Sequence, residues 1–302
     1  MNQNLQRCFT VFTATYNRAH TLPRVYESLK NQTFKDFEWL IVDDGSSDGT
    51  KELVGQWQKE SLLTIRYFYQ ENRGKHVAFN RGVREAAGEL FLTLDSDDTC
   101  VPRALELFLY HWKKIEPTVR EQFSGITCLC MDTSGKIVGS RFPANDMDTS
   151  PITIHTKYGV EGEKWGFHRS SILKRYPFPE FPGERFVPEG LVWNRLASQY
   201  KIRFINEALR VYEGRPDGLS ASIMKLRARN PSGTREYYFE FTQLVIPLKY
   251  RLKAFINYFR FSAHGRVPMR VALRDLGQPF PGLFFLPIGY LFYLADRRAI
   301  KK

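Results

Sequence analysis

Short apolar runs alternate with amphipathic stretches along the first 112 residues, and this alternation restricts the folds open to the chain. Strand-like runs rich in β-branched and aromatic residues cover residues 9–15, 37–42, 65–69 and 90–94. Helical spacing of apolar side chains follows each of the first three runs, and Pro102 opens a helix that continues through Trp112. Strands that alternate with helices of about ten residues are typical of βαβ units. The pattern therefore predicts an α/β fold with a mostly parallel sheet flanked by helices.

Two residues are expected to mark helix ends in this part of the chain. Thr21 precedes apolar residues at helical spacing and has the side chain of an N-cap. Gly88 follows the helix predicted over residues 77–87 and suits the C′ position.

Three of the four predicted strands end in polar residues. The polar clusters are residues 15–18, Asp43 with Asp44, and residues 95–98. In open sheets of parallel strands, ligands bind beside the carboxyl ends of the strands. We therefore expect the three clusters to face one crevice. Asp48 and Thr50, after the second strand, also fit an ordinary helix N-cap.

The fourth strand stops abruptly in Asp95-Ser96-Asp97-Asp98. Clustered carboxylates at the end of a buried strand indicate that a cation meets them there. Two oxygen ligands from one strand end suit Mg²⁺ or Mn²⁺, which prefer oxygen and bind diphosphates. The segment predicts a metal-bound, phosphorylated ligand, and the alternative is an acidic surface turn.

The composition is that of a globular protein from a reducing compartment. The chain has 302 residues, of which 43% are hydrophobic, enough for one large α/β domain with an appendage. Four cysteines, Cys8, Cys100, Cys128 and Cys130, lack metal-ligand spacing and are expected to be reduced thiols. Residues 1–18 lack the pattern of a signal peptide, so we expect a cytoplasmic protein.

The positive charge is concentrated near the C-terminus. Residues 225–302 hold fifteen Lys and Arg against four acids, a net charge of +11, within a total of +12. Basic and aromatic residues at helical spacing over residues 248–261 are typical of a helix that lies on a membrane surface. Nucleic acid is disfavoured as a partner, because the cations are interleaved with long apolar runs.

An apolar run over residues 280–295 adds to this membrane interpretation. A spanning helix needs about 20 apolar residues, and this run is shorter and contains Pro281, Pro287 and Gly289. We expect an interfacial or re-entrant element, with the cations after residue 296 near anionic head groups. The alternative is a pair of helices packed on the preceding α/β domain.

The predicted domains follow from these patterns. Residues 1–224 form one α/β domain, with a first half over 1–115 and a second half over 116–224. Residues 225–302 form a basic, aromatic, helical region associated with a membrane.

Four segments together resemble family 2 glycosyltransferases. They are residues 13–18, residues 42–50, residues 78–89 and residues 94–98, in the order and spacing of that family. The resemblance covers about residues 9–115. It implies a GT-A (Rossmann-like) fold, a nucleotide-sugar donor, a divalent cation (Mn²⁺ or Mg²⁺) and inversion at the anomeric carbon, and we expect the nucleotide to be UDP.

The resemblance also implies roles for individual residues. Asp44 accepts a hydrogen bond from the donor base, Asp95 and Asp97 hold ribose and metal, and Arg215 contacts the diphosphate from a segment that closes over it. The donor-binding residues implied in this way are Thr15, Tyr16, Arg18, Asp44, Asn80, Arg81, Asp95, Ser96 and Arg215.

For the catalytic base the resemblance points to Glu189. Many members of the family have Glu-Asp here, with the Asp as the base, whereas this chain has Gly190 in the place of the Asp. The base is therefore assigned to Glu189, and the alternative is an acid favoured by the dipole of a helix N-terminus.

The resemblance also makes residues 1–224 the catalytic domain, with a nucleotide-sugar-binding half over 1–115 and an acceptor-binding half over 116–224. It places the acceptor beside residues 161–169. Glu163 and Trp165 are the candidate acceptor contacts, and Trp165 also fits a core position. His168 is a candidate for approaching the metal or the phosphates, or else a packed histidine.

The sequence thus predicts a metal-dependent, inverting, hexosyltransferase-type enzyme of surface polysaccharide synthesis. Its acceptor is a glycan or lipid-linked molecule, and the enzyme is peripheral on the inner face of the cell membrane. Two alternatives remain, a polyprenyl-phosphate glycosyltransferase and a non-catalytic scaffold that binds nucleotide sugars.

Overall fold

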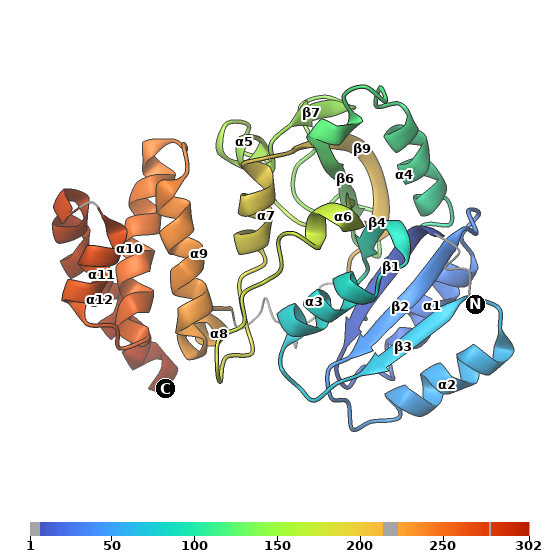
Figure 1. The fold of residues 1–302 in the computed structure, drawn as a ribbon, viewed down its shortest axis with the longest axis horizontal. Coiled ribbons are helices and arrows are strands. Elements are labelled where there is room, and N and C mark those ends of the chain that lie inside the picture. Colours follow the sequence, from blue (N-terminus) through green and yellow to red (C-terminus); the bar gives the residue numbers. More distant parts are fainter. Residues whose placement is uncertain (1–6, 214–222, 278, 302) are drawn as a thin grey trace. The chain divides into compact units, whose positions relative to one another are not determined.

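A computed structural model describes residues 7–213, 223–277 and 279–301 of the chain (Figure 1). The chain forms two compact units. The first comprises Met1–Pro177 and Arg195–Gly214, and the second comprises Phe178–Asn194 and Arg215–Lys302. Arg215 and the rest of residues 214–222 lie outside the described residues.

The first unit contains the alternating strands and helices that the sequence predicts. Its first half consists of β1 (Arg7–Thr15), α1 (Leu22–Lys30), β2 (Phe37–Asp43), α2 (Thr50–Glu60), β3 (Ile65–Tyr69), α3 (Lys75–Glu85), β4 (Gly88–Thr93), β5 (Thr99–Cys100) and α4 (Ala104–Lys113). Its second half consists of β6 (Phe123–Met131), β7 (Met147–Thr149), α5 (Pro151–Thr156), β8 (Lys164–Arg169), α6 (Ser170–Leu173) and β9 (Lys201–Val211). The boundary between the two units passes through α7 (Gly190–Ala197).

Within the described part of the chain, the strands form a single sheet in the order β3-β2-β1-β4-β8-β6-β9-β5, with β7 beside β9. The strands β3, β2, β1 and β4 run parallel to one another, as predicted. Beyond β4 the sheet is mixed, because β8 is antiparallel to both β4 and β6. The parallel half therefore brings the carboxyl ends of β1, β2 and β4 to one edge.

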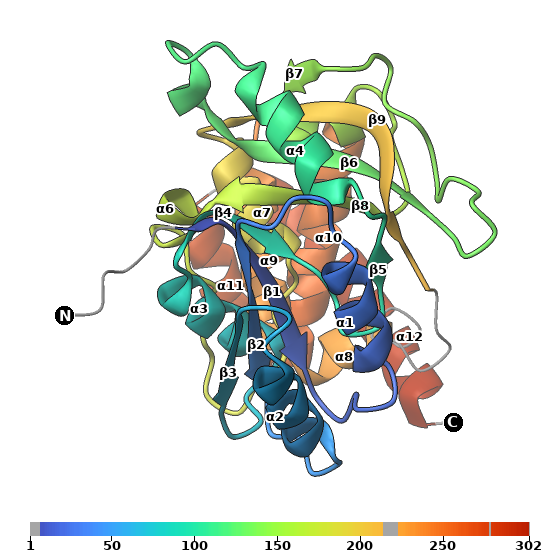
Figure 2. The same cartoon turned by 90° about the vertical axis from the view of Figure 1, so that its right-hand side faces the viewer.

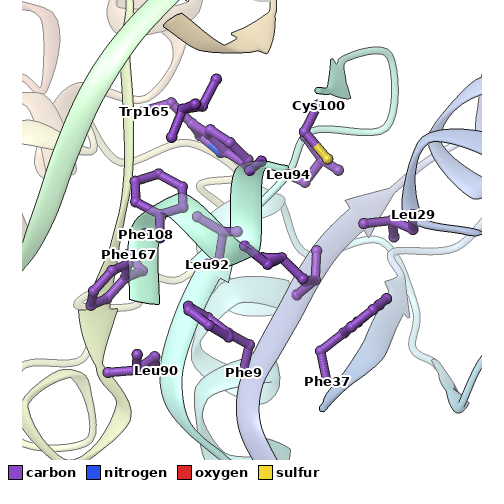
Figure 3. Close-up of a cluster of buried hydrophobic side chains, with 14 of the residues drawn as sticks. Phe9, Leu29, Phe37, Leu90, Leu92, Leu94, Cys100, Phe108, Trp165 and Phe167 are labelled. Atoms are coloured by element: carbon purple, nitrogen blue, oxygen red, sulfur yellow. The ribbon is translucent and has the colours of Figure 1, made fainter. Parts of the chain in front are cut away.

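Alternate residues of β1 point to opposite faces of the sheet, and each face is covered by helices. Phe9 and Val11 belong to a core cluster that also includes side chains of α1, α2 and α4 (Figure 3). On the other face, Phe12 packs edge-on against Phe79 of α3 and stacks on Phe91 of β4. Accordingly, α1 and α3 lie on opposite sides of β1 and β2 (Figure 2).

The contact between α3 and β1 depends on a glycine. A Cβ atom at Gly82 would lie 2.3 Å from the ring of Phe12, closer than two carbon atoms can approach. Because glycine has no side chain, the helix backbone can rest directly on the aromatic ring of the strand.

Two predicted helix ends differ in the structure. Thr21 precedes α1, but its hydroxyl donates to the carbonyl oxygens of Arg18 (3.2 Å) and Ser96 (2.7 Å) instead of capping the helix. Gly88 begins β4, and a Cβ atom there would lie 2.3 Å from the backbone nitrogen of Thr10. Tertiary contacts, which local sequence does not reveal, decide the role of both residues.

The second unit is helical. Its helices are α8 (Ile223–Arg229), α9 (Pro231–Gln243), α10 (Leu248–His264), α11 (Met269–Leu276) and α12 (Pro279–Lys301). The central helix is α10, which packs against both α9 and α12 (Figure 1). Buried aromatic residues of α10, including Phe255, Tyr258 and Phe259, form the core of this unit.

Residues 178–194 belong to this helical unit, whereas the sequence-based division placed them in the acceptor half of the catalytic domain. The Glu184 carboxylate accepts the backbone N–H groups of Ser232 (2.7 Å) and Gly233 (3.0 Å) at the start of α9. The backbone N–H of Arg185 donates to the side chain of Asn230 (2.7 Å). These bonds join segments that are more than 40 residues apart in the chain.

Across the described residues, none of the helices combines the length and the apolar character needed to cross a membrane.

Candidate functional site

The ends of β1 and β2 are held together by their backbones. Thr15 and Asp43 are partners in the parallel register of the two strands. The next backbone N–H, that of Asp44, donates to the carbonyl oxygen of Thr15 (2.8 Å). On the other side of β1, the N–H of Leu94 donates to the carbonyl oxygen of Phe12 (2.8 Å). The polar residues that follow β1, β2 and β4 therefore begin at the same edge of the sheet.

Asp44 is buried at this edge and holds the turn that precedes α3. Its carboxylate accepts the backbone N–H groups of Arg73 (3.0 Å) and Gly74 (2.7 Å) and the side-chain amide of Gln70 (2.8 Å). A carboxylate has about four acceptor positions, so further hydrogen bonds to Asp44 remain possible. Its role in binding the donor base stays a prediction.

Gly45 lets this turn approach closely. Its φ angle is +92°, and a Cβ atom there would lie 2.8 Å from the backbone nitrogen of Asn72. Any other residue would be strained in this conformation and would push the two turns apart.

The turn after β1 is tied to the turn after β2 by reciprocal hydrogen bonds. The N–H of Asn17 donates to the hydroxyl of Ser46 (2.8 Å), and the Asn17 side chain accepts the N–H of Ser47 (2.8 Å). Asn17 adopts a φ angle of +53°, a conformation that Asn tolerates better than most residues. This framework positions Tyr16, whose side chain is about half exposed, and Arg18, which is partly buried.

Asp48 belongs to the same framework. Its carboxylate accepts the N–H of Ala19 (3.0 Å) and both the N–H (3.2 Å) and the hydroxyl (2.5 Å) of Thr50. Burial acts to raise the pKa of Asp48, but these hydrogen bonds outweigh burial and the pKa lies below its usual range. Asp48 thus bonds to the first residue of α2, but the N-cap position is Gly49 and the helix has no side-chain cap, so neither Asp48 nor Thr50 is the predicted N-cap.

Asp95 lies between two cationic side chains. The ammonium group of Lys75, the first residue of α3, is 2.8 Å from Asp95, and the guanidinium of Arg210 is 3.9 Å away. Burial acts to raise the pKa of Asp95, but these positive charges outweigh it and the pKa lies below its usual range. Asp44 and Asp95 thus contact consecutive residues of one turn, Gly74 and Lys75.

Arg210 connects three carboxylates. Its buried guanidinium is 3.3 Å from Asp98 and 3.3 Å from Glu163, in addition to Asp95. Burial raises the pKa of Asp98 to about 7, against the lowering effect of Arg210. Asp98 also accepts the backbone N–H of Glu213 (3.1 Å). Glu163 therefore takes part in a structural ion cluster, and its contact with an acceptor stays a prediction.

Asp97, also in this acidic segment, is partly buried. Burial raises the pKa of Asp97, and the negative charge of Asp95 raises it further, whereas Arg18 lowers it. A cation placed beside Asp95 and Asp97 would relieve this repulsion.

The described side chains fit a cation that is shared with a ligand. In that part of the chain, no three His, Cys, Asp or Glu residues are grouped as a metal site. Mg²⁺ and similar ions are commonly held by one or two carboxylates together with substrate phosphates and water. Asp95 and Asp97 match this donor set. To bind the cation, Asp95 would have to give up its ion pair with Lys75.

The remaining candidate donor contacts lie on β1, α3 and the loop after β4. Thr15 is buried, and its hydroxyl has no hydrogen-bond partner among the described residues. Asn80 is buried in α3, and the guanidinium of Arg81 donates to the carbonyl oxygen of Tyr69 (2.6 Å). The carbonyl group of Ser96 accepts the hydroxyl of Thr21. None of these contacts tests a role in donor binding.

Trp165 is a core residue. It is buried in the main core cluster, its ring packs against Phe108 with centroids 5.3 Å apart, and its indole N–H donates to the carbonyl oxygen of Thr93 (Figure 3). This burial favours the core position predicted as the alternative, and a contact of Trp165 with an acceptor stays a prediction.

His168 also packs within the sheet. It pairs with Phe91 of β4, and its Nδ1 atom lies 3.3 Å from the hydroxyl of Ser124. Burial lowers the pKa of His168 to about 4, so the imidazole is neutral near pH 7.

Glu189 stands at the start of α7, in the second unit. Its carbonyl oxygen accepts the backbone N–H groups of Val192 (3.1 Å) and Trp193 (3.3 Å). Next to it, a Cβ atom at Gly190 would lie 2.9 Å from the ring of Tyr237. The space beside residue 190 is therefore filled by an aromatic ring. The predicted diphosphate contact, Arg215, lies outside the described residues.

Sequence reasoning missed Lys75 and Arg210. Lys75 carries a recognisable signal, since it follows a strand end and a glycine and begins a helix. Arg210 has none, because it reaches the acidic segment only through the antiparallel pairing of β5 with β9, in which Cys100 is its partner.

Comparison with known proteins supports the resemblance. The model of the family described as "Glycosyl transferase family 2" matches residues 10–120. A Campylobacter jejuni protein named GalNAc(5)-diNAcBac-PP-undecaprenol beta-1,3-glucosyltransferase is 28% identical over 67% of this chain and 63% of its own length. The cholesterol galactosyltransferase of Borreliella burgdorferi is 34% identical over 72% of this chain and 63% of its own length. The chain thus spans less than two thirds of these curated relatives.

A solved structure shares the fold. The crystal structure of residues 1–349 of S. aureus TarS in complex with UDP-GlcNAc superposes with a TM-score of 0.61 at 19% identity, and the match covers 97% of this chain and 92% of that one. The fold is therefore that of the GT-A glycosyltransferases. The family match, the relatives and this fold agree with the motifs at the strand ends, and the chain contains a glycosyltransferase family 2 region over residues 10–120.

Proposed function

We propose that this protein transfers a sugar, with inversion, from a UDP-linked donor to a glycan or lipid-linked acceptor in surface polysaccharide synthesis. One observation carries the proposal. Asp44 and Asp95 contact adjacent residues, Gly74 and Lys75, at the edge of the sheet where β1, β2 and β4 end. An edge of this kind is where α/β sheets bind nucleotides.

The relatives support the choice of donor and acceptor. One of them is named as a glucosyltransferase and another as a galactosyltransferase, and the name of the first contains an undecaprenol-linked substrate. The TarS structure contains UDP-GlcNAc. For this chain, we propose Thr15, Tyr16, Arg18 and Asp44 as contacts of the nucleoside, and Asn80, Arg81, Ser96 and Arg215 as further donor contacts.

Charge at the site supports a metal-assisted displacement. Asp95 and Asp97 would hold a divalent cation, which supplies Lewis-acid stabilisation of the departing diphosphate. The ammonium of Lys75 begins α3 beside Asp95, where it adds positive charge near the leaving group. Glu189 accepts the proton of the acceptor hydroxyl in the same step.

Thermal unfolding with nucleotide sugars tests the proposal. UDP-glucose, UDP-galactose and UDP-GlcNAc are compared with GDP-mannose, each with and without Mn²⁺. A ligand at a hundred times its Kd adds about 2.7 kcal/mol to the free energy of unfolding, so a specific donor raises the Tm. If none of the three UDP sugars raises the Tm, the choice of a UDP-linked donor is contradicted.

Asp97→Ala is expected to abolish the Mn²⁺-dependent part of this stabilisation and to lower sugar transfer at least about a hundredfold, because the cation loses a ligand. Asp36→Ala is the matched control. Asp36 is an exposed carboxylate just before β2, at the opposite end of the strands. An Asp97→Ala variant that responds to Mn²⁺ and turns over like the unmodified protein shows that the metal assignment is wrong.

A polyprenyl-phosphate glycosyltransferase is the second candidate. The ring of Tyr237 fills the space beside Gly190, where many members of the family have the Asp that serves as the base, and this favours a reaction that needs no base. A phosphate acceptor is already ionised and needs no base. If the Glu189→Gln variant keeps full activity, this candidate is selected. If the variant loses activity while its donor binding is unchanged, Glu189 is supported as the base. Donor binding without release of UDP in the presence of any acceptor selects the scaffold.

We also propose that the protein acts at the cytosolic face of the cell membrane. The net charge of +11 over residues 225–302 supports attraction to anionic lipids.

A further inference from the structure

One face of α12 is apolar and exposed. Leu283, Phe284 and Leu291 are 62%, 68% and 64% exposed, and Pro287 between them is exposed as well. Positions 284, 287 and 291 recur at intervals of three and four residues, so these side chains lie along one side of the helix. Tyr290 and Phe292, both more than 40% exposed, flank them. We call Leu283, Phe284, Pro287, Tyr290 and Leu291 the outer face of α12.

The opposite side of α12 is occupied by α10. The ring of Phe285 stacks on Phe255 with centroids 5.8 Å apart, and a Cβ atom at Gly289 would lie 2.6 Å from the carbonyl oxygen of Ile256. Further along, Arg260 forms an ion pair with Asp296. The outer face therefore contributes nothing to the contact with α10, and a helix with only this packing role would have polar residues there.

The same contacts show that α10 and α12 run in the same direction. Phe255 contacts Phe285, and nearer the C-terminal ends of both helices Arg260 pairs with Asp296. The start of α10 thus lies toward the same end of the unit as Leu283. Leu248 at that start is 66% exposed, and Lys249 and Lys253 beside it are exposed cations. At the other end of the outer face, Arg298 is exposed seven residues after Leu291.

The charge of the unit argues for the kind of partner. Residues 225–302 carry fifteen Lys and Arg against four acids, and two of these acids, Asp275 and Asp296, are paired with Arg235 and Arg260. A second copy of the chain would bring a surface of the same sign, which repels. An anionic phospholipid surface offers phosphates for the cations and an acyl boundary for the apolar side chains.

We propose that the outer face of α12, together with the start of α10, is a membrane-docking surface that lies in the head-group region of an anionic bilayer. The proposal rests on the proposed function in one respect, the choice of the cell membrane as the partner. What it adds is the assignment of the contact to particular residues. The helix lies in the plane of the bilayer, since no described helix is suited to span it. Leu283, Phe284 and Leu291 enter the acyl boundary, and Lys249, Lys253 and Arg298 face the phosphates.

Co-sedimentation with vesicles tests the apolar contacts. The full chain is mixed with vesicles of phosphatidylcholine alone or of phosphatidylcholine with phosphatidylglycerol. Binding to the anionic vesicles is expected, and Leu291→Glu is expected to lower the partition coefficient about tenfold or more, because a charge replaces an inserted side chain. Leu62→Glu is the control, since Leu62 is 60% exposed in the first unit and outside this surface.

The charged contacts are tested separately. Arg298→Gln combined with Lys249→Gln is expected to weaken binding to the anionic vesicles and to reduce its dependence on salt. The control pair is Lys51→Gln with Lys59→Gln, two exposed lysines of α2. Circular dichroism of every variant checks that the fold is retained.

Three results would overturn the proposal. In the first, the unmodified protein shows no preference for anionic vesicles. In the second, the Leu291→Glu and Leu62→Glu variants bind vesicles equally. In the third, the unmodified protein sediments as a dimer and the Leu291→Glu variant as a monomer. Stabilisation by UDP sugars is measured on the same samples. Vesicle binding without any response to UDP sugars would remove the proposed function and leave the docking surface intact.

Discussion

At the scale of single residues, the acidic side chains at the strand ends hold the protein together before any ligand arrives. Asp44 binds two backbone N–H groups, Asp95 pairs with Lys75, and Asp98 lies against Arg210. The sequence presents all three as candidate ligands. In the structure Asp44 and Asp95 also hold residues 73–75, which under the proposed function would supply positive charge to a bound diphosphate.

Asp44→Ala is expected to lower the free energy of unfolding by about 3 kcal/mol, because the buried N–H of Gly74 and the partly buried N–H of Arg73 would both lose their acceptor. Urea unfolding followed by circular dichroism measures the change. Asp44→Asn, which keeps one acceptor oxygen, should lose less. A loss below about 0.5 kcal/mol for the alanine variant would show that water replaces the carboxylate.

At the scale of helices and strands, local pattern predicts the elements of the first half well. The strand over residues 65–69 is β3 residue for residue, and the strand over residues 9–15 begins two residues earlier, at Arg7. The helix predicted over residues 77–87 is α3, shifted to Lys75–Glu85. The shift arises because the chain must leave the helix before Gly88, where β4 meets the backbone of β1.

The packing of α3 on β1 makes a prediction of its own. Gly82→Ala is expected to cost about 2 kcal/mol, since the new methyl group would overlap the ring of Phe12. The control is Gly55→Ala in α2, where a Cβ atom meets nothing within 4 Å. That change should be neutral or stabilising by up to about 1 kcal/mol, because Ala has the higher helix propensity. Both values come from urea unfolding, and equal effects would contradict the packing argument.

At the scale of the whole molecule, the chain consists of two units with different chemistry. The first has the sheet, the acidic strand ends and 24 of the 32 acids, whereas residues 225–302 in the second carry most of the net charge. The predicted boundary at residue 224 stays a prediction, but residues 178–194 form their hydrogen bonds with the helical unit. The candidate base, Glu189, belongs to this segment.

Two units of this kind are expected to respond separately to a local change. Asp296→Ala removes the partner of Arg260 and His264, so it should destabilise the helical unit by about 3 kcal/mol. Hydrogen exchange should then become faster in α10 and α12 and stay unchanged in β1 and β4. Asp275→Ala is the control, since its ion pair with Arg235 is more exposed and worth less than about 1 kcal/mol. Faster exchange in both units would show that they unfold as one.

The amino-acid sequence by itself determined the parallel half of the sheet, the helices that flank it, the polar strand ends and the basic C-terminal region. These features depend on hydrophobic period, turn residues and charge, which are local. Tertiary structure alone decided the insertion of β8 between β4 and β6, the burial of Trp165, and the positions of Lys75 and Arg210 around Asp95. The reason is strand register, which brings Arg210 to a segment more than 100 residues earlier, and no local pattern encodes such a pairing.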